Sequence, residues 1–382
     1  MSLKTTFSGI LILAFLLTTP ALAQTSQPVR DNSLDVYDKS IADATTAMAL
    51  IDAYSKRALA LSSPLVKKYD QAIEDMTKVI SLSKKNGLDP ATIGLDYNTR
   101  AIIRERNGDI AGAVEDYTNA IEATLGKNKD YYNLRAGDYE DLNLREKALN
   151  DYTTAIALSG DHSDWLANFR RGSIYFEQKE FDKAIADLTR SLQDEIVKSD
   201  TTLAVRSYNQ RGLAYLAINK TKEAFDDFNK AVKTVGILYY IRGITPPSEF
   251  GSISFNNRGK AAYLEGMAEK DVQRRAALLN AALADLNFAI LLAPKPIDRM
   301  FSNRGHIYLE KAKLALPSSA EPTLKLAQTD FDKVLELNKT NPSPELVKDA
   351  VATKEAILKH ESSVIPFSAT PGPSSATPPW LK

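Results

Sequence analysis

The fold is decided by two short segments, YNQRGLAY (residues 208–215) and AFDDFNKA (residues 224–231). In the first segment an aromatic residue, an arginine, a small residue and a second aromatic residue stand at i, i+3, i+4 and i+7, which is one stripe of an α-helix. In the second segment alanine, an aromatic residue and alanine form a similar stripe. Two short amphipathic helices joined by a tight turn are typical of an antiparallel helical hairpin.

The same pair of segments recurs along the chain, with an arginine in each first helix and an aspartate in each second helix. Successive arginines are 35 to 47 residues apart, which is the spacing of stacked supersecondary units. A single hairpin of this size buries too little surface to be stable alone, so we expect neighbours to stack. The seven units contain Arg57, Arg100, Arg135, Arg171, Arg211, Arg258 and Arg304, with Asp75, Asp116, Asp151, Asp187, Asp227, Asp285 and Asp330.

The sixth and seventh units are longer than the others. They carry 11 and 10 extra residues between arginine and aspartate, within Leu264–Asn280 and Glu310–Lys325. Three turns shared between two helices lengthen each by about 8 Å at 1.5 Å per residue. We therefore expect the C-terminal hairpins to project.

The repeats resemble the tetratricopeptide repeat (TPR) family, and the resemblance covers residues 47 to 338. The family's second-helix pattern of alanine, a large residue and alanine is matched by Ala224, Phe228 and Ala231, and Pro294 matches its closing proline. The chain departs from the family where arginine replaces the usual leucine, and where the first unit has two extra residues before Ala72. The resemblance implies an all-α, right-handed solenoid with a concave groove that binds peptides.

The segments around the repeats indicate an exported protein. Lys4, the apolar run from Phe7 to Leu17 and the Ala21-Leu22-Ala23 site are typical of a secretory signal, and the apolar run is shorter than the roughly 20 residues that span a membrane. An uncleaved anchor is the competing interpretation. The expected organisation is a signal peptide at 1–23, a linker at 24–33, the TPR solenoid at 34–361 with one long helix at 34–61 and a capping helix at 344–360, and a disordered tail at 362–382.

Charge and composition favour some function classes over others. Lysine plus arginine equals aspartate plus glutamate at 48 each, so no net field attracts nucleic acid or an anionic membrane. The chain has no cysteine and only three scattered histidines, His162, His306 and His360. We find no phosphate-binding loop, zinc motif or nucleophile elbow, and therefore expect no catalytic residue, cofactor or metal site.

The repeated arginines and aspartates are interpreted as structural ion pairs. Each arginine lies on the buried stripe of a first helix, and each aspartate lies between the alanine and the large residue of a second helix. A buried charge needs a partner. We therefore expect pairs such as Arg100 with Asp116, Arg135 with Asp151, Arg171 with Asp187, and Arg211 with Asp227.

The candidate binding residues lie one position further around each first helix, about 100° from the buried stripe. In the TPR family this stripe faces the groove. It is polar and acidic in the second and third units and apolar from the fourth, and the family's carboxylate-clamp lysines are replaced by asparagine in those two polar units. The stripe contains Asn98, Ile102 and Glu105; Asn133, Gly137 and Glu140; Phe169, Ser173 and Phe176; Asn209, Leu213 and Leu216; Asn256, Lys260 and Tyr263; Ser302, His306 and Leu309.

These features predict a periplasmic or secreted scaffold that binds a polypeptide, within an envelope or export complex. Asparagine amides would bond the peptide main chain, and apolar side chains would contact Phe169 to Leu216. A basic segment is expected beside Glu105 and Glu140. Alternatively, neighbouring helices or the apolar linker Gly236–Ser252 cover the apolar positions. A different function class, a structural protein that self-associates through the long C-terminal hairpins, also fits the sequence.

Export with cleavage after Ala23 has a direct test. Mass spectrometry of the mature protein should find Gln24 as its first residue, because the small-x-small site precedes it. An intact Met1 on membrane-extracted protein would contradict cleavage and favour the anchor.

Overall fold

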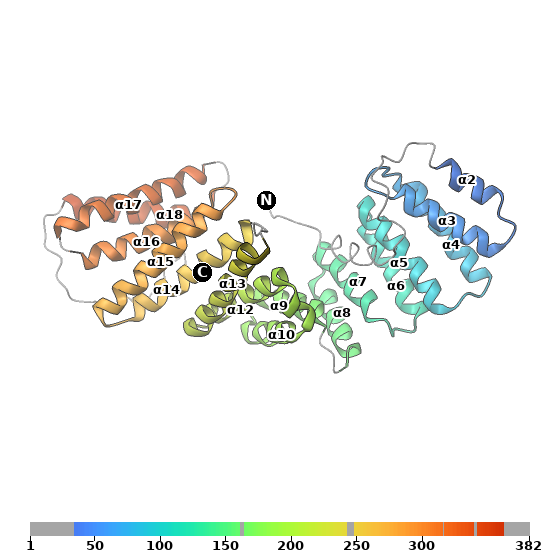
Figure 1. The fold of residues 1–382 in the computed structure, drawn as a ribbon, viewed down its shortest axis with the longest axis horizontal. Helices are drawn as coiled ribbons and strands as arrows, with labels where there is room; N and C mark the ends of the chain where they lie inside the picture. The colour runs from blue at the N-terminus through green and yellow to red at the C-terminus, as the bar shows by residue number, and fades with distance from the viewer. Residues whose placement is uncertain (1–33, 161–163, 243–247, 316, 340–341, 363–382) are drawn as a thin grey trace. The chain divides into compact units, whose positions relative to one another are not determined.

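A computed structural model describes residues 34–160, 164–242, 248–315, 317–339 and 342–362. In these ranges the chain forms helices and no strand. The contacts divide the chain into two compact units, with the boundary after Ile174 inside helix α9 (Figure 1). The expected signal peptide, the linker at 24–33 and the tail beyond residue 362 lie outside the described ranges.

The first unit is a series of antiparallel helical hairpins. Neighbouring helices in the chain pack against each other from α2 onward, as expected for stacked repeats. The helices are α2 (Asp35–Ala42), α3 (Ala47–Leu61), α4 (Tyr69–Lys85), α5 (Pro90–Asn107), α6 (Ile110–Ala123), α7 (Lys129–Asp141), α8 (Arg145–Leu158) and the first part of α9 (Trp165–Glu177).

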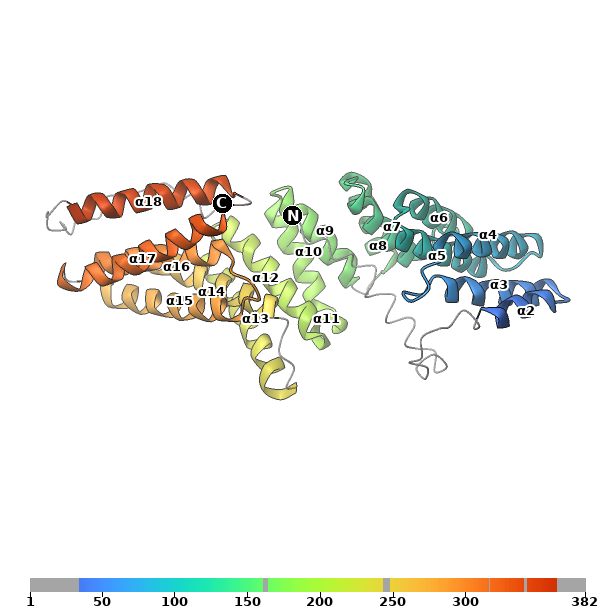
Figure 2. The ribbon, with the colours of Figure 1, turned by 90° about the horizontal axis from the view of Figure 1, so that it is seen from above.

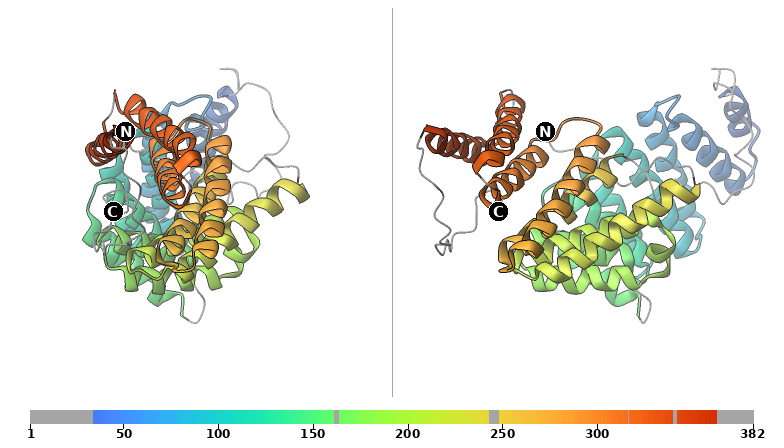
Figure 3. Two further views of the ribbon diagram at one scale, coloured as in Figure 1. Left: turned by 90° about the vertical axis from the view of Figure 1, so that its left-hand side faces the viewer. Right: turned by 60° about the vertical axis from the view of Figure 1, so that its left-hand side comes forward.

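The second unit is also built of antiparallel helical hairpins, and several of them are longer. Figure 3 shows α14 and α15 side by side along their length, and Figure 2 shows α18 beside α17, as their contacts require. The helices are α10 (Phe181–Gln193), α11 (Glu195–Ser199), α12 (Thr201–Ala217), α13 (Thr221–Arg242), α14 (Ser248–Ala268), α15 (Val272–Leu292), α16 (Asp298–Leu314), α17 (Pro317–Leu337) and α18 (Pro344–Ser362).

Two expectations about the elements were wrong. The single helix expected over Leu34–Leu61 is broken into α2 and α3, because the Thr46 side chain accepts a hydrogen bond from the Ala49 N–H and starts a new helix. The expected linker Gly236–Ser252 is largely helical, since α13 runs to Arg242 and α14 begins at Ser248. The expected cap at the C-terminal end is present, as α18 begins at Pro344.

The core of each hairpin combines small residues with one large ring from the second helix. Tyr117, Tyr152, Phe228 and Phe331 are fully buried, as are the alanines beside them. At Gly212 a Cβ atom would lie 2.5 Å from the Phe228 ring, so the first helix can approach that ring only without a side chain. This close approach explains the small residue after each arginine.

The turns within the hairpins follow from local chemistry. Gly108 ends α5 with a left-handed φ of 83°, a conformation that glycine adopts without steric cost. The Asp109 side chain then accepts a hydrogen bond from the Gly112 N–H at 2.9 Å and caps α6. A helix stop and a helix start in adjacent residues produce the tight turn.

Six of the seven expected ion pairs form within their own hairpins, and we refer to them as the arginine ladder. In each, Nε and Nη2 of the guanidinium donate to the two carboxylate oxygens of the aspartate at 2.6–2.9 Å, which is the bidentate geometry. The pairs are Arg57–Asp75, Arg100–Asp116, Arg135–Asp151, Arg211–Asp227, Arg258–Asp285 and Arg304–Asp330. Arg171 and Asp187 belong to different units, and their pairing stays a prediction.

Every ladder arginine except Arg57, whose Nη1 group donates to Asp38 of α2, also donates its remaining Nη1 group to the preceding second helix. The acceptor is the residue two positions after that helix's aspartate: Thr77 for Arg100, Thr118 for Arg135 and Thr189 for Arg211, at 2.9–3.0 Å. Arg171 bonds Thr153 in the same way, and Arg258 and Arg304 use Asn229 and Asn287. One guanidinium therefore holds a hairpin together and joins it to its neighbour.

The first-helix aromatic residues lie over the guanidinium groups. The Arg211 carbon Cζ is 5.9 Å from the centroid of the Tyr208 ring and 5.8 Å from that of Tyr215, and Arg135 lies between Tyr132 and Tyr139 at 5.6 Å from each. These distances allow cation–π attraction. These tyrosine rings at i and i+7 are half-buried and pack over the arginine side chain. The second-helix rings, in contrast, fill the core.

The ladder predicts that removal of one partner is far more costly than removal of both. Arg211→Ala leaves the buried carboxylate of Asp227 without its partner and should lower the free energy of unfolding by about 3–5 kcal/mol, whereas Arg211→Met with Asp227→Leu should cost much less. Urea unfolding of the mature chain measures both. The control is Lys230→Ala, since this lysine is 3.8 Å from the same carboxylate but its side chain is 54% exposed. Equal losses for Arg211→Ala and Lys230→Ala would contradict the structural role.

Candidate peptide-binding face

The candidate site is a stripe on the first helices. In each repeat it consists of the residues at positions −2, +2 and +5 relative to the first-helix arginine. We call it the groove stripe. Its polar end is in the first unit, on α5 and α7. Asn98 is half-buried, whereas Asn133 is buried and donates its Nδ2 group to Asp164 at 3.0 Å. The Oδ1 atoms of both asparagines are buried and have no hydrogen-bond partner among the described residues.

The two acidic residues of the stripe are anchored by the second-helix tyrosines. The Tyr117 hydroxyl donates to Glu105 and the Tyr152 hydroxyl donates to Glu140, each at 2.5 Å. An Nη1 atom of Arg170 lies 3.9 Å from the Glu140 carboxylate. These hydrogen bonds hold the two carboxylates in equivalent positions on successive first helices.

A third acid, Asp138, lies beside this pair and is missed by the stripe pattern. It is the third residue after Arg135, and the equivalent residues Ile103, Ile174 and Ile307 are buried and apolar. Asp138 is 2% exposed, and its Oδ2 atom has no hydrogen-bond partner among the described residues. Burial, together with the neighbouring carboxylates of Glu105 and Asp141, raises the pKa of Asp138 to about 8.

The asparagines of the second unit do not face a ligand as expected. The Asn209 Nδ2 group donates to Ser254 at 2.7 Å, and its Oδ1 atom accepts from Asn257 at 3.1 Å. Asn256 is likewise buried, and its Oδ1 atom accepts from Asn303 at 2.9 Å. These amides satisfy one another between adjacent first helices, so the expectation that they bind a peptide main chain was wrong here.

The apolar part of the stripe is only partly covered. Phe169, in the first unit, is buried at 8% exposed. In the second unit Phe176, Leu213 and Leu216 are half-buried, so each keeps surface that a ligand can contact. Phe176 packs edge-on against Phe181 at 5.6 Å, and the two leucines pack on the Phe228 core. The described residues therefore do not bury this stripe completely.

The C-terminal end of the stripe is closed by neighbouring helices. Tyr263 is 5% exposed and His306 is 8% exposed, so neither offers the open surface that we expected. The His306 Nε2 atom lies 2.8 Å from an oxygen of Asp349 in α18, because the capping helix packs on α16 and α17. Lys260, in contrast, remains half-buried.

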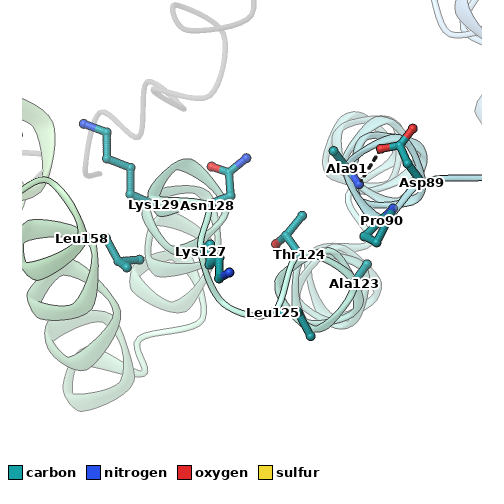
Figure 4. Close-up of a pocket in the computed structure, with 10 residues that line it drawn as sticks. All are labelled: Asp89, Pro90, Ala91, Ala123, Thr124, Leu125, Lys127, Asn128, Lys129 and Leu158. Atoms are coloured by element: carbon teal, nitrogen blue, oxygen red, sulfur yellow. Dashed lines mark hydrogen bonds between the residues drawn. The ribbon is translucent and has the colours of Figure 1, made fainter.

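One solvent-exposed hollow lies away from the groove stripe. It has a volume of about 640 Å³ and is open to solvent, between the start of α5, the end of α6 and the turn before α7 (Figure 4). Asp89 lines it, but its carboxylate accepts from the Ala91 N–H, as the dashed line marks, and thereby caps α5. The residues that line this hollow include ones that stabilise helix ends, so we do not propose it as a binding site.

Two further observations bear on the class of site. Within the described residues, no group of three or more histidine, aspartate or glutamate side chains is arranged to hold a metal ion. One described helix, α15, is long and apolar enough to cross a membrane, with 28% of its most apolar window buried. Its Asp285 forms a bidentate ion pair with Arg258 of α14, which makes α15 the second helix of a hairpin.

Comparisons with known proteins agree with this architecture. Residues 167–193 and 205–234 match the tetratricopeptide repeat family model. The C-terminal part of a TPR repeat-containing protein from Cytophaga hutchinsonii is 16% identical, with a TM-score of 0.52 over 69% of this chain and 91% of that chain. A TPR protein from Parabacteroides merdae is 19% identical, with a TM-score of 0.47 over 79% of this chain and 98% of that chain. A search of curated proteins found no match.

The repeated hairpins, their spacing and the family match define the class of this protein. It has the all-helical fold of TPR repeat proteins, as the resemblance of its sequence predicted.

The buried acid predicts a pH dependence that a single substitution should remove. The pKa of Asp138 is about 8 in the folded chain against 3.8 as the ordinary value, so the folded state holds a proton that the unfolded state has lost. Stability therefore falls as pH rises from about 4 to about 8, by at most about 1.4 kcal/mol per pH unit.

We expect Asp138→Asn to be more stable than the unmodified chain at pH 8, with the difference shrinking toward pH 5. Thermal unfolding followed by circular dichroism at both pH values measures this. Glu122→Gln, on an exposed acid of the neighbouring helix α6, is the control and should leave the pH dependence unchanged. Parallel pH dependences for Asp138→Asn and the unmodified chain would contradict the buried, protonated acid.

Proposed function

We propose that this protein is an exported scaffold that binds a polypeptide along its groove stripe, within a cell-envelope or export complex. The carrying observation is the apolar run Phe176, Leu213 and Leu216, which recurs on successive first helices and stays partly exposed. Exposed apolar positions in register along a repeat protein favour an extended ligand, since each repeat offers one contact.

The proposed ligand has apolar side chains for this run. The half-buried leucines rest on the fully buried Phe228, so the surface is held rigid before a ligand arrives. A rigid surface loses little conformational entropy on binding, which favours affinity. In the first unit the carboxylates of Glu105 and Glu140 favour a basic segment of the ligand.

The proposed location is the periplasm or the exterior, and it rests on the N-terminal signal pattern. We propose no enzymatic activity, because Glu105 and Glu140 accept from the second-helix tyrosines and the Asn209 amide bonds to side chains of the next first helix. A scaffold needs a contact surface and no reacting group.

Self-association is the second candidate function, and one observation favours it. The outer face of α15 leaves Phe288 54% exposed and Leu291 77% exposed on the extended sixth hairpin. Analytical ultracentrifugation of residues 24–382 separates the two functions. A monomer supports the scaffold, and a dimer that Leu291→Glu dissociates supports self-association.

The scaffold function predicts that charge on the apolar run abolishes ligand capture. A photo-crosslinking amino acid at Leu216 of the exported chain should trap its partner in the native envelope, and Phe176→Glu with Leu213→Glu should remove that crosslink, because buried carboxylates would replace apolar contacts. Leu291→Glu is the matched control on an exposed leucine outside the stripe. A double variant that folds normally and still yields every crosslink would refute the proposed face.

A further inference from the structure

The outer face of α15 is apolar and uncovered. Five exposed residues follow one another at spacings of three and four, so they form a single stripe along the helix. The two largest side chains are 54% exposed at Phe288 and 77% exposed at Leu291. Asp285 is the only charged residue between residues 276 and 292, and it is buried in its ion pair with Arg258. We call this surface the α15 stripe; it consists of Ala277, Ala281, Ala284, Phe288 and Leu291.

No other repeat has bulky apolar side chains at the last two positions of this stripe. These positions are the third and the sixth residue after the second-helix aspartate. Where α15 has Phe288, the other second helices have Lys78, Asn119, Thr154, Arg190, Lys230 and Lys333. Where it has Leu291, they have Ser81, Glu122, Ala157, Gln193, Lys233 and Glu336. The hairpin fold therefore does not require bulky apolar residues there, and their presence in α15 calls for another explanation.

The Phe288 ring is held in place by the first helix of its own hairpin. It stacks on Phe255 of α14, with ring centroids 5.6 Å apart and an interplanar angle of 24°. In α13 the equivalent residue is Lys230, whose Nζ atom lies 5.5 Å from the centroid of the Tyr208 ring. Phenylalanine thus takes the place of a cation over the first-helix ring. Because the stacked ring is fixed, it loses little entropy when its exposed face is covered.

Exposed cations lie at both ends of the α15 stripe. Lys270 and Arg274 precede it, and Arg274 continues the spacing of the stripe. Lys295 is exposed just after the helix ends. The acids at the first end bond to the backbone, since Glu269 accepts from the Asp271 N–H at 3.0 Å and Asp271 accepts from the Arg274 N–H at 2.8 Å. The surface is therefore apolar at its centre and basic at its ends.

This distribution of charge decides between the surfaces that could cover the stripe. Pairing with the same helix of a second copy brings cations together in either direction, Arg274 beside Lys295 when antiparallel and Arg274 beside Arg274 when parallel. Like charges opposed across an interface are unfavourable. An anionic surface, in contrast, attracts both ends at once. Because the chain as a whole has no net charge, this attraction is local to α15.

We propose that the α15 stripe docks on the surface of a bilayer that contains anionic lipids. Phe288 and Leu291 enter the boundary between headgroups and acyl chains, while Arg274 and Lys295 reach the lipid phosphates. A bilayer supplies negative charge at both ends of the stripe and an apolar layer between them. The helix lies in the plane of the surface and does not cross the membrane, since Asp285 fixes it to α14.

This docking goes beyond the proposed polypeptide binding and does not depend on it. The groove stripe is on the first helices, whereas the α15 stripe is on a second helix. A scaffold docked through α15 would be held at the membrane while its groove stripe binds a ligand.

Vesicle sedimentation with the mature chain tests the docking. The unmodified chain should bind vesicles made of equal parts phosphatidylglycerol and phosphatidylcholine. Phe288→Glu should weaken this binding by at least about tenfold, because it removes apolar area and adds a repelling charge. Leu59→Glu, on a 49% exposed leucine of α3, is the matched control and should bind like the unmodified chain. Absence of vesicle binding, or equal affinities for the two variants, would overturn the proposal.

The lipid composition tests the role of the cations. Arg274→Gln should weaken binding to the mixed vesicles about fivefold, because one cation near the anionic surface is lost. Vesicles of phosphatidylcholine alone should bind more weakly, and inorganic phosphate at constant ionic strength should not compete. Equal binding to both kinds of vesicle would contradict the anionic surface. Competition by phosphate would identify a site for small anions and also overturn the proposal.

A fluorescent label shows which face meets the lipid. The chain has no cysteine, so Ala284→Cys carries a single environment-sensitive dye at the centre of the α15 stripe. Its emission should shift to shorter wavelength when the mixed vesicles are added. The dye on Lys233→Cys, at an exposed position of α13, should not shift. A shift at Lys233→Cys that equals or exceeds the one at Ala284→Cys would overturn the assignment.

Two outcomes keep this inference apart from the functions proposed above. Leu291→Glu should lose vesicle binding and retain the crosslink at Leu216, whereas full vesicle binding by Phe288→Glu would refute the docking and leave the scaffold standing. In ultracentrifugation without lipid, a dimer that Phe288→Glu dissociates would assign the stripe to a second copy and overturn the bilayer as its partner.

Discussion

The three-way contact of one arginine in each repeat is the interaction on which the rest of the structure depends. The guanidinium of Arg135 donates two hydrogen bonds to Asp151 of its own hairpin and a third hydrogen bond to Thr118 of the preceding hairpin. A planar group with fixed donor directions can satisfy both acceptors only when the three helices have one mutual arrangement. The contact therefore sets the pairing within a hairpin and the stacking between hairpins together.

The orientation of each first helix follows from this contact, and so does the character of its outer stripe. Because the arginine and its flanking rings face the second helix, the residues two before and two after the arginine turn toward the neighbouring first helices. In the second unit the asparagines at the earlier position bond across to the next repeat, as Asn209 does with Asn257. The later position stays more open, and there the chain carries Leu213 in one repeat and the half-buried Lys260 in the next.

Many of the contacts within the hairpins could be predicted, because every repeat must satisfy the same packing requirement and the residues that do so recur at regular intervals in the sequence. The joint recurrence of arginine and aspartate identified the six pairs that form within their hairpins. The acceptor two residues after the aspartate also recurs in the first six units, as threonine or asparagine, but its role appears only when adjacent hairpins are stacked. Contacts outside the period escaped prediction for a similar reason. His306 sits at a groove position by pattern, yet α18 covers it, and nothing in the repeat encodes where a capping helix will pack.

Native-state hydrogen exchange of the mature chain tests the central role of the arginine most directly. Arg135→Ala should reduce amide protection in α7 and α8, and also in α6, because the side chain bonds the Asp151 and Thr118 groups of both hairpins. The exposed substitution Asn150→Ala on the same hairpin should leave α6 unchanged. Protection in α6 that is identical in the Arg135→Ala variant and the unmodified chain would contradict the claim that one guanidinium joins adjacent repeats.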